Sequence, residues 1–236
     1  MLGLGNSIII GGAALESFSL DQISGLQLWL KNGEGVTAAQ WDDSSGNGNH
    51  AAQSDSGKRG AVEDGGIDFN QSQNHYDIDT TIAANAFTMF VAMEPDSGSS
   101  MSFLSSANAN DFIRINQTAD NEFRTKRAAN GIDLIVSHST DFSFEGNGGV
   151  EKFIVMYRQE TDNTITIGVN NDFDNFAEAN STLSRFNFNV IGSQGTGGSN
   201  AFDGTIYEVA IYNEILSDSD ATLVIGDIAS RVGITL

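Results

Sequence analysis

The segment 41–51, with the sequence WDDSSGNGNHA, holds the side chains best suited to chemistry. Small oxygen-bearing side chains stand at every second position within it: Asp43, Ser45, Asn47 and Asn49. Gly46 and Gly48 lie between them and allow sharp backbone turns. Such oxygens are ligands for a hard cation such as calcium, and they also bond their own backbone in stacked turns. The residue types alone leave both alternatives open.

Residue patterns typical of catalysis do not occur in the sequence. Retaining glycosidases need two carboxyl groups about 5–5.5 Å apart. The spacings E-x-D-x-E and E-x-D-x-x-E, which would place such a pair on one strand, are absent. The sequence also has no P-loop, no G-x-S-x-G motif and no cysteine. Its three histidines do not have the spacing of zinc ligands. We therefore expect a protein that is not an enzyme.

The composition limits the classes of partner. The chain has 31 acidic and 11 basic residues, so its net charge is −20. A surface this negative repels phosphate backbones, and we expect no nucleic-acid binding. No segment reaches the roughly 18 apolar residues of a membrane span, so we expect none. A length of 236 residues, with 39% of them apolar, suits one large domain.

Hydrophobic alternation and frequent turn residues predict an all-β protein. In the segment 23–30, the leucines are expected on one strand face, and Gln27 and Trp29 on the other. The segment 87–93 is almost entirely apolar, which predicts a central strand buried on both faces. Further strands are predicted at 67–69, 76–79, 112–115, 122–126, 152–158, 164–169, 186–192 and 204–212. So many short strands favour a two-sheet antiparallel sandwich.

One short helix is predicted near the C-terminus. Ser217 is a good N-cap, Asp220 can complete a capping box, and Gly233 is placed to end the helix. The apolar residues at helical spacing should pack on the sheets: Ala221, Val224, Ile225, Ile228 and Val232. We expect residues 1–22 to form an N-terminal arm or docking segment and residues 23–236 to form the sandwich domain.

Two segments resemble a known family. Segment 41–51 is similar to the motif W-x-D-x-S-G-N-G-N-x-A of many laminin-G-like domains, in the concanavalin A-like lectin–glucanase superfamily. Segment 202–217, FDGTIYEVAIYNEILS, resembles the closing motif F-x-G-x-I-D-E-V-x-I-Y-N-x-x-L-S. The resemblance spans roughly residues 25–234. It implies a concanavalin A-like jelly-roll sandwich, a fold that serves glycan binding, adhesion, capsid decoration and glycoside cleavage alike.

The same resemblance implies a calcium site. In relatives that bind structural calcium, oxygens of the early acidic loop and of the last strand meet at the edge of the sandwich. Carried onto this sequence, the ligands are Asp43, Asn47, the backbone near Gly48, and Glu208. Tyr207 stands where the family often has Asp, which removes one hard oxygen. A purely hydrogen-bonded loop is the alternative.

Three aromatic side chains in polar segments are candidates for ligand binding. Trp41, His75 and Tyr76 lie among polar residues, where an aromatic face can stack on a sugar ring. For Trp41, packing under the loop that follows it is the alternative.

Four of the 11 basic residues gather on one predicted hairpin: Arg114, Arg124, Lys126 and Arg127. In so acidic a protein this group is a candidate interface with the acidic face of a neighbouring copy. The alternative is internal ion pairing with Asp111, Asp120 and Glu122.

The opening sequence MLGLGNSI resembles the first residues of virion proteins from marine tailed phages. We therefore expect a non-enzymatic structural or accessory virion protein on a capsid or fibre, at the virion surface. Its partners would be other virion proteins or copies of itself, with host glycans as a further contact. The alternative is a secreted bacterial carbohydrate-binding or adhesion module, whose partner is a polysaccharide. The start of the chain lacks the basic residues of a secretory signal, so we expect no cleaved signal peptide.

Overall fold

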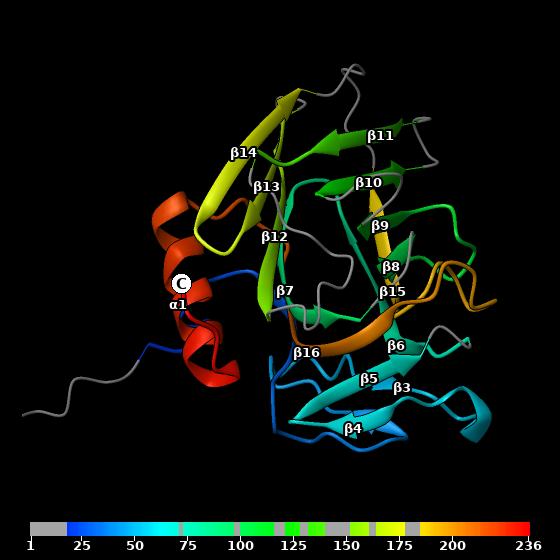
Figure 1. The fold of residues 1–236 in the computed structure, drawn as a ribbon. Helices are drawn as coiled ribbons and strands as arrows, with labels where there is room; N and C mark the ends of the chain where they lie inside the picture. Colours follow the sequence, from blue (N-terminus) through cyan, green and yellow to red (C-terminus); the bar gives the residue numbers. More distant parts are fainter. Residues whose placement is uncertain are drawn as a thin grey trace, which may run out of the picture.

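The computed structural model of the chain describes residues 18–70, 73–96, 100–115, 121–127, 132–139, 152–160, 164–177 and 185–236. Within these residues, two antiparallel sheets face each other, and the helix α1 (Asp218–Val232) lies on the outer side of one of them (Figure 1). Two short 3₁₀ helices, η1 (Leu20–Gln22) and η2 (Ser56–Lys58), complete the described elements. The predicted all-β sandwich with one C-terminal helix is confirmed.

Sheet A has the strand order β14-β13-β12-β7-β16-β5-β4, and β1 also pairs with β16. All its pairings are antiparallel. Its strands are β1 (Leu26–Leu30), β4 (Ala61–Glu63), β5 (Gly66–Asn70), β7 (Phe87–Pro95), β12 (Phe153–Gln159), β13 (Thr164–Val169), β14 (Asp172–Ala177) and β16 (Asp203–Tyr212).

Sheet B has the strand order β11-β10-β9-β8-β15-β6-β3-β2, again with antiparallel pairings. Its strands are β2 (Gln40–Trp41), β3 (Ala51–Ala52), β6 (Tyr76–Ala84), β8 (Met101–Ser105), β9 (Phe112–Ile115), β10 (Glu122–Arg127), β11 (Ile132–Ser137) and β15 (Phe186–Ile191).

The two predicted hairpins are confirmed as the antiparallel pairs β9–β10 and β12–β13. Six of the described strands were not predicted from the sequence: β2, β3, β4, β8, β11 and β14. The strand β14 has the sequence DFDNFA and lies at an edge of sheet A, where its acidic residues remain in contact with water. Edge strands need less apolar surface than central ones, so their sequence signal is weaker.

The main core lies between the two sheets and is rich in aromatic rings. Phe87 of sheet A meets Phe188 and Phe186 of sheet B, with ring centroids 4.9 and 5.6 Å apart, and it stacks on Tyr157 at 5.5 Å. Aromatic pairs of this kind contribute about 0.5–1.5 kcal/mol each beyond the burial of apolar area. These contacts hold the sheets face to face.

The centre of sheet A is buried on both faces. Its central strand β7 reads FTMFVAMEP and is buried along most of its length. Met89 and Val91 point into the core between the sheets, while Phe90 and Ala92 belong to a second cluster on the opposite face. The helix α1 lies against this face of sheet A (Figure 1). It covers the second cluster with Ala221, Val224, Ile225, Ile228, Ala229 and Val232. The prediction of a central strand buried on both faces is confirmed.

The ends of α1 follow the predicted pattern. The Ser217 hydroxyl accepts a hydrogen bond from the Asp220 N–H at 3.1 Å and donates to the Asp220 carboxylate at 2.8 Å. Gly233 has a φ of 81° and its N–H donates to the Ala229 carbonyl at 2.9 Å, which ends the helix. The described residues include no helix with the length and apolar character that a membrane span requires.

Glu208 of β16 is a fully buried carboxylate between sheet A and α1. A register shift between Ile206 and Glu208 in the β16–β7 pairing accompanies its turn toward the helix. Its oxygens accept hydrogen bonds from Trp29 Nε1 at 2.7 Å and from the Asn32 N–H at 3.3 Å. They also form a two-bond ion pair with Arg231 of α1, at 2.9 and 3.0 Å. One carboxylate therefore connects β1, β16 and the helix.

One predicted strand face needs correction. A register shift between Leu26 and Leu28 in the β1–β16 pairing moves Leu26 to the helix side of sheet A. Leu28 and Leu30 face the core between the sheets, as expected. The bulge breaks the simple alternation of the strand, so the three leucines do not share one face.

The predicted arm begins to pack before residue 23. Leu20 is fully buried in the cluster under α1, and its carbonyl accepts a hydrogen bond from the Tyr212 hydroxyl at 3.0 Å. Residues 18–22 are therefore part of the sandwich body. Residues 1–17 of the predicted arm lie outside the described residues.

We predict that Glu208→Gln destabilises the protein by about 2–3 kcal/mol, because it leaves the half-buried Arg231 without its main counter-ion. Asp227→Asn is the matched control, since it removes a second, more exposed contact to the same guanidinium and should cost about 1 kcal/mol or less. Urea unfolding measures both changes. Equal effects of the two substitutions would show that the buried carboxylate has no special role.

Candidate functional site

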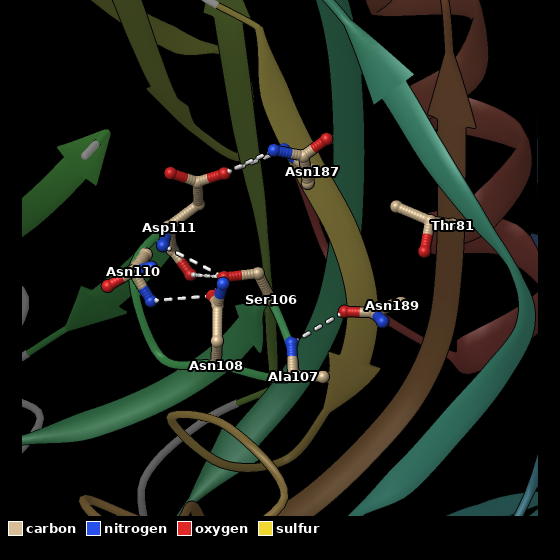
Figure 2. A pocket seen from close by; sticks show the side chains of 8 residues that line it. All are labelled: Thr81, Ser106, Ala107, Asn108, Asn110, Asp111, Asn187 and Asn189. Carbon is tan, nitrogen blue, oxygen red and sulfur yellow. Dashed lines mark hydrogen bonds between the residues drawn. The ribbon is translucent and has the colours of Figure 1, made fainter. Parts of the chain in front are cut away.

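A polar pocket with a volume of about 510 Å³ opens on the outer face of sheet B. Figure 2 shows the side chains around it, which come from β6, from β15 and from the loop between β8 and β9. They are Thr81, Ser106, Ala107, Asn108, Asn110, Asp111, Asn187 and Asn189. The volume falls within the range of about 300–1,000 Å³ that is usual for small-molecule sites.

The strand β15 places two asparagines at this pocket. Its phenylalanines are buried in the core, so the alternating Asn187 and Asn189 point to the opposite face. The β15–β6 pairing is irregular after Phe188, which is where Asn189 lies. Such irregularities re-aim side chains. Asn189 lies next to the loop, with Thr81 of β6 on its other side (Figure 2).

Ser106 organises the loop 106–111. Its hydroxyl donates a hydrogen bond to Asn108 Oδ1 and accepts one from the Asp111 N–H, both at 2.9 Å. Asn108 Oδ1 also accepts from the Asn110 N–H at 3.2 Å. Ala109 has a φ of 59°, in the left-handed region that non-glycine residues rarely adopt. The hydrogen bonds around Ser106 hold the loop in this conformation.

Asp111 connects the loop to β15. Its Oδ2 accepts hydrogen bonds from the N–H of Asn187 at 3.1 Å and from Asn187 Nδ2 at 2.8 Å. A third bond runs from the Ala107 N–H to Asn189 Oδ1 at 2.7 Å. These three bonds fix the loop and the strand in one geometry (Figure 2).

The same bonds decide which amide atoms face a ligand. Because Nδ2 of Asn187 donates to Asp111, Oδ1 of Asn187 remains to accept a hydrogen bond. Because Oδ1 of Asn189 accepts from Ala107, Nδ2 of Asn189 remains to donate. The hydroxyl of Thr81 can do either. The pocket therefore offers oriented donors and acceptors side by side.

The three aromatic residues predicted to bind a ligand are buried instead. Trp41 is 2% exposed, and its Nε1 donates to the Lys31 carbonyl at 3.0 Å. Tyr76 is 2% exposed, and its hydroxyl donates to the Ala38 carbonyl at 2.9 Å. His75 is 3% exposed. A sugar could not stack on these buried rings. The alternative given for Trp41, packing inside the protein, applies to all three side chains.

The loop 41–51 is closed by its own hydrogen bonds. Asp43 Oδ1 accepts from the backbone N–H groups of Trp29 and Ser45, each at 2.9 Å, and its Oδ2 accepts from the Asn49 N–H at 2.9 Å. Asn47 donates through Nδ2 to the carbonyl of Leu26. Gly48 has a φ of 73°, as the turn requires. This arrangement favours the hydrogen-bonded alternative, in which the loop is fastened to β1.

The other predicted calcium ligand, Glu208, is occupied by Trp29 and Arg231, as described above. Within the described ranges, no group of three or more His, Cys, Asp or Glu side chains is arranged to hold a metal ion. Calcium binding remains a prediction of the sequence resemblance. A cation at Asp43 or Glu208 would have to displace several hydrogen-bond donors.

A crowded acidic group lies on sheet A. Burial raises the pKa of Asp68, and the negative charges of Glu63, Asp96 and Asp203 raise it further. Burial and the charge of Asp203 likewise raise the pKa of Asp96. These carboxylates repel one another, which follows from the large negative charge of the chain.

The structure separates the four basic residues of the predicted interface. Arg124 and Lys126 are partly exposed on the outer face of sheet B, and Arg114 is mostly buried on the same face. Arg127 is fully buried and alternates to the inner face of β10. The cluster on the outer face therefore contains three of the four residues. Its role in contacts between copies remains a prediction.

Internal ion pairing, the alternative, does occur on this face. Arg124 donates to Asp133 of β11 through Nε and Nη2, both at 2.6 Å. This hydrogen-bonded pair lowers the pKa of Asp133. The sequence did not identify Asp133 as the partner; of the predicted partners, Asp111 bonds Asn187, and Asp120 lies outside the described residues.

The fold is an antiparallel jelly-roll sandwich, and it is similar to the fold of several solved structures. The CBM40 of the Ruminococcus gnavus IT-sialidase, bound to α2,3-sialyllactose, has a TM-score of 0.52 and 15% identity; the match covers 68% of this chain and 95% of that one. A heptameric SAP-like pentraxin from Limulus polyphemus has a TM-score of 0.51 and 13% identity, covering 64% of this chain and 75% of that one.

The Trypanosoma rangeli sialidase in complex with sialic acid has a TM-score of 0.61 and 14% identity. The match covers 91% of this chain but only 34% of the sialidase, so the chain spans about a third of that enzyme. No protein-family model matches the chain, and no curated protein does either. At these identities the likenesses establish the fold, and the jelly-roll sandwich implied by the sequence resemblance is confirmed.

The sequence contains a signal for the pocket that its motifs do not reveal. The strand segment FNFNV alternates Phe with Asn, which indicates a polar outer face opposite an aromatic core. The stretch SSANAND, residues 105–111, is rich in small polar residues. Neither signal reveals that the two segments meet, because they are about 80 residues apart.

We predict that millimolar calcium leaves the melting temperature of the chelator-stripped protein unchanged. We also predict that Asp43→Ala lowers the free energy of unfolding by about 2–3 kcal/mol, because it leaves several backbone N–H groups unpaired. Asp42→Ala is the control, because Asp42 is its exposed neighbour and should have little effect. A clear rise in melting temperature with calcium in the wild type, lost in Asp43→Ala, would instead establish the cation site.

Proposed function

We propose that this chain is a non-catalytic carbohydrate-binding module whose binding site is the pocket on sheet B. The observation that supports this most directly is the set of oriented amides around the pocket, in which Asn187 presents an acceptor and Asn189 a donor. A sugar hydroxyl both donates and accepts, so neighbouring hydroxyls match donors and acceptors that stand side by side. Rigid placement of these groups reduces the entropy lost on binding.

The pocket residues support binding rather than bond cleavage. Asp111 is the one carboxylate among the eight lining residues, and its Oδ2 is engaged by Asn187. Glycoside cleavage by the usual route needs two carboxyl groups that flank the bond. Asp111 therefore acts in the proposal as a positioning residue for Asn187.

The similar structures support the same class of function. The R. gnavus CBM40 is matched over nearly its whole length, and that module binds a sialylated sugar in its solved structure. The sialidase likeness covers a third of that enzyme and carries no catalytic residue to this chain. A binding module that works beside other domains or proteins fits both likenesses.

The setting of the site is also part of the proposal. Display at a virion surface, with other virion proteins or copies of the chain as partners, follows from the opening sequence. A secreted bacterial binding or adhesion module is the alternative. Both settings use the same pocket, and mass spectrometry of purified particles for this chain would distinguish them.

We predict that a glycan array that includes α2,3-sialyllactose identifies a ligand for the full chain. In calorimetry, Asn189→Ala should weaken the binding of that glycan about tenfold, because one or two hydrogen bonds are lost. Asn213→Ala is the matched control, because Asn213 is exposed and follows a strand of sheet A. Binding that is equal in Asn189→Ala and the wild type, or no glycan bound at all, would contradict the proposal.

A further inference from the structure

Next to the pocket, the outer face of sheet B carries a basic cluster, made of Arg114, Arg124 and Lys126. Arg114 of β9 and Arg124 of β10 are cross-strand partners, and both guanidinium groups lie near the ring of Phe112, at 4.3 and 5.7 Å. The carboxylates on this face of β10 and β11 are Glu122 and Asp133. In a chain of net charge −20, a site with an excess of positive charge stands out.

Two buried polar atoms in this region lack a hydrogen-bond partner among the described residues. They are Nε of Arg114, whose residue is 6% exposed, and Oγ of Ser102, whose residue is fully buried. Ser102 of β8 is the cross-strand partner of Arg114, so the two side chains lie next to each other on the same face. Buried polar atoms are almost always paired, and an unpaired set calls for an explanation.

The pKa of Arg114 also indicates that this buried side chain lacks a full set of partners among the residues that the structure describes. Burial lowers the pKa of Arg114 to about 10, and the nearby charge of Arg124 adds to the effect. The group stays charged at neutral pH all the same. A buried guanidinium without a full set of partners destabilises a fold, so its presence is easier to explain as a binding group than as a structural one.

We propose that Arg114, Arg124 and Ser102 bind an oxyanion, a carboxylate or a sulfate, and that the ligand of the adjacent pocket is therefore an acidic polysaccharide. This deepens the proposed function and rests on it. Arg114 binds the oxygens of the anion through its N–H groups, and the Ser102 hydroxyl beside it adds a donor. Asp133 holds Nε and Nη2 of Arg124, so Arg124 contributes its positive charge.

The geometry of sheet B allows one ligand to reach both places. The basic cluster begins on β9, and Asn187 and Asn189 are on β15, with β8 between them. Neighbouring strands are about 4.8 Å apart, so the two strands lie about 10 Å apart, a distance that a short oligosaccharide can span. Because the chain as a whole has a net charge of −20, an acidic polymer would approach it at this basic cluster.

The first experiment measures the binding of inorganic sulfate to the full chain by calorimetry, at constant ionic strength with chloride as the other anion. We expect Arg114→Met to weaken sulfate binding at least about tenfold. Lys58→Met, which removes a partly exposed charge on η2, should change nothing. Arg114→Met should fold normally, since methionine replaces a buried charge with an apolar chain of similar length. No sulfate binding, or equal binding in wild type and Arg114→Met, would overturn the anion site.

The second experiment compares polygalacturonate, dextran sulfate and unmodified dextran. Tighter binding of either acidic polymer than of dextran, lost in Arg114→Met, supports the proposal, and the polymer that binds identifies carboxylate or sulfate as the anion. Glycan binding that survives in Arg114→Met but not in Asn189→Ala would leave the carbohydrate function standing and reject the anion inference. Sulfate binding lost in Arg114→Met, with no glycan bound by the wild type, would keep the anion site but reject the polysaccharide and the proposed function.

Discussion

The unequal burial of the two sheets is the constraint on which the rest of the structure depends. Sheet A packs against sheet B on one face and against α1 on the other, so its central strands are buried on both faces. The buried Glu208, bonded to Trp29 and Arg231, holds the helix on that sheet. Sheet B has only one face in the core. The pocket and the basic cluster both lie on its other face, where polar side chains remain available to a ligand.

Hydrogen bonds within the protein prepare that face. The loop 106–111 is organised by Ser106 and joined to β15 through Asp111, and these bonds determine which atoms of Asn187 and Asn189 remain for a partner. A site ordered in advance loses less entropy when it binds. The opposite case is Arg114, whose Nε has no partner among the described residues. The hydrogen bonds of the pocket loop are formed within the protein, whereas Nε of Arg114 in the basic cluster lacks a partner in the described part of the chain. A single ligand that contacts both places is therefore proposed.

Much of the fold could be predicted from the sequence, because strong periodicity reflects burial directly. The apolar run 87–93 indicated a strand covered on both faces, and Ser217 and Gly233 indicated the ends of the helix. The candidate site could not be predicted in the same way. Trp41 and Tyr76 have polar neighbours in the sequence, yet both rings are buried. Trp41 ends β2 and Tyr76 begins β6, and the two strands direct these side chains inward. The pocket depends on register and on pairing between distant segments, which alternation alone does not specify.

The central claim is that the outer face of sheet B is the binding face. The most direct test is to map the backbone amides of the full chain by NMR as a bound oligosaccharide is titrated. The account predicts the largest shifts in the loop 106–111, at Asn187 and Asn189, and on β9 near Arg114. Shifts confined to α1, to the acidic group of sheet A or to the loop 41–51, with sheet B unaffected, would contradict it.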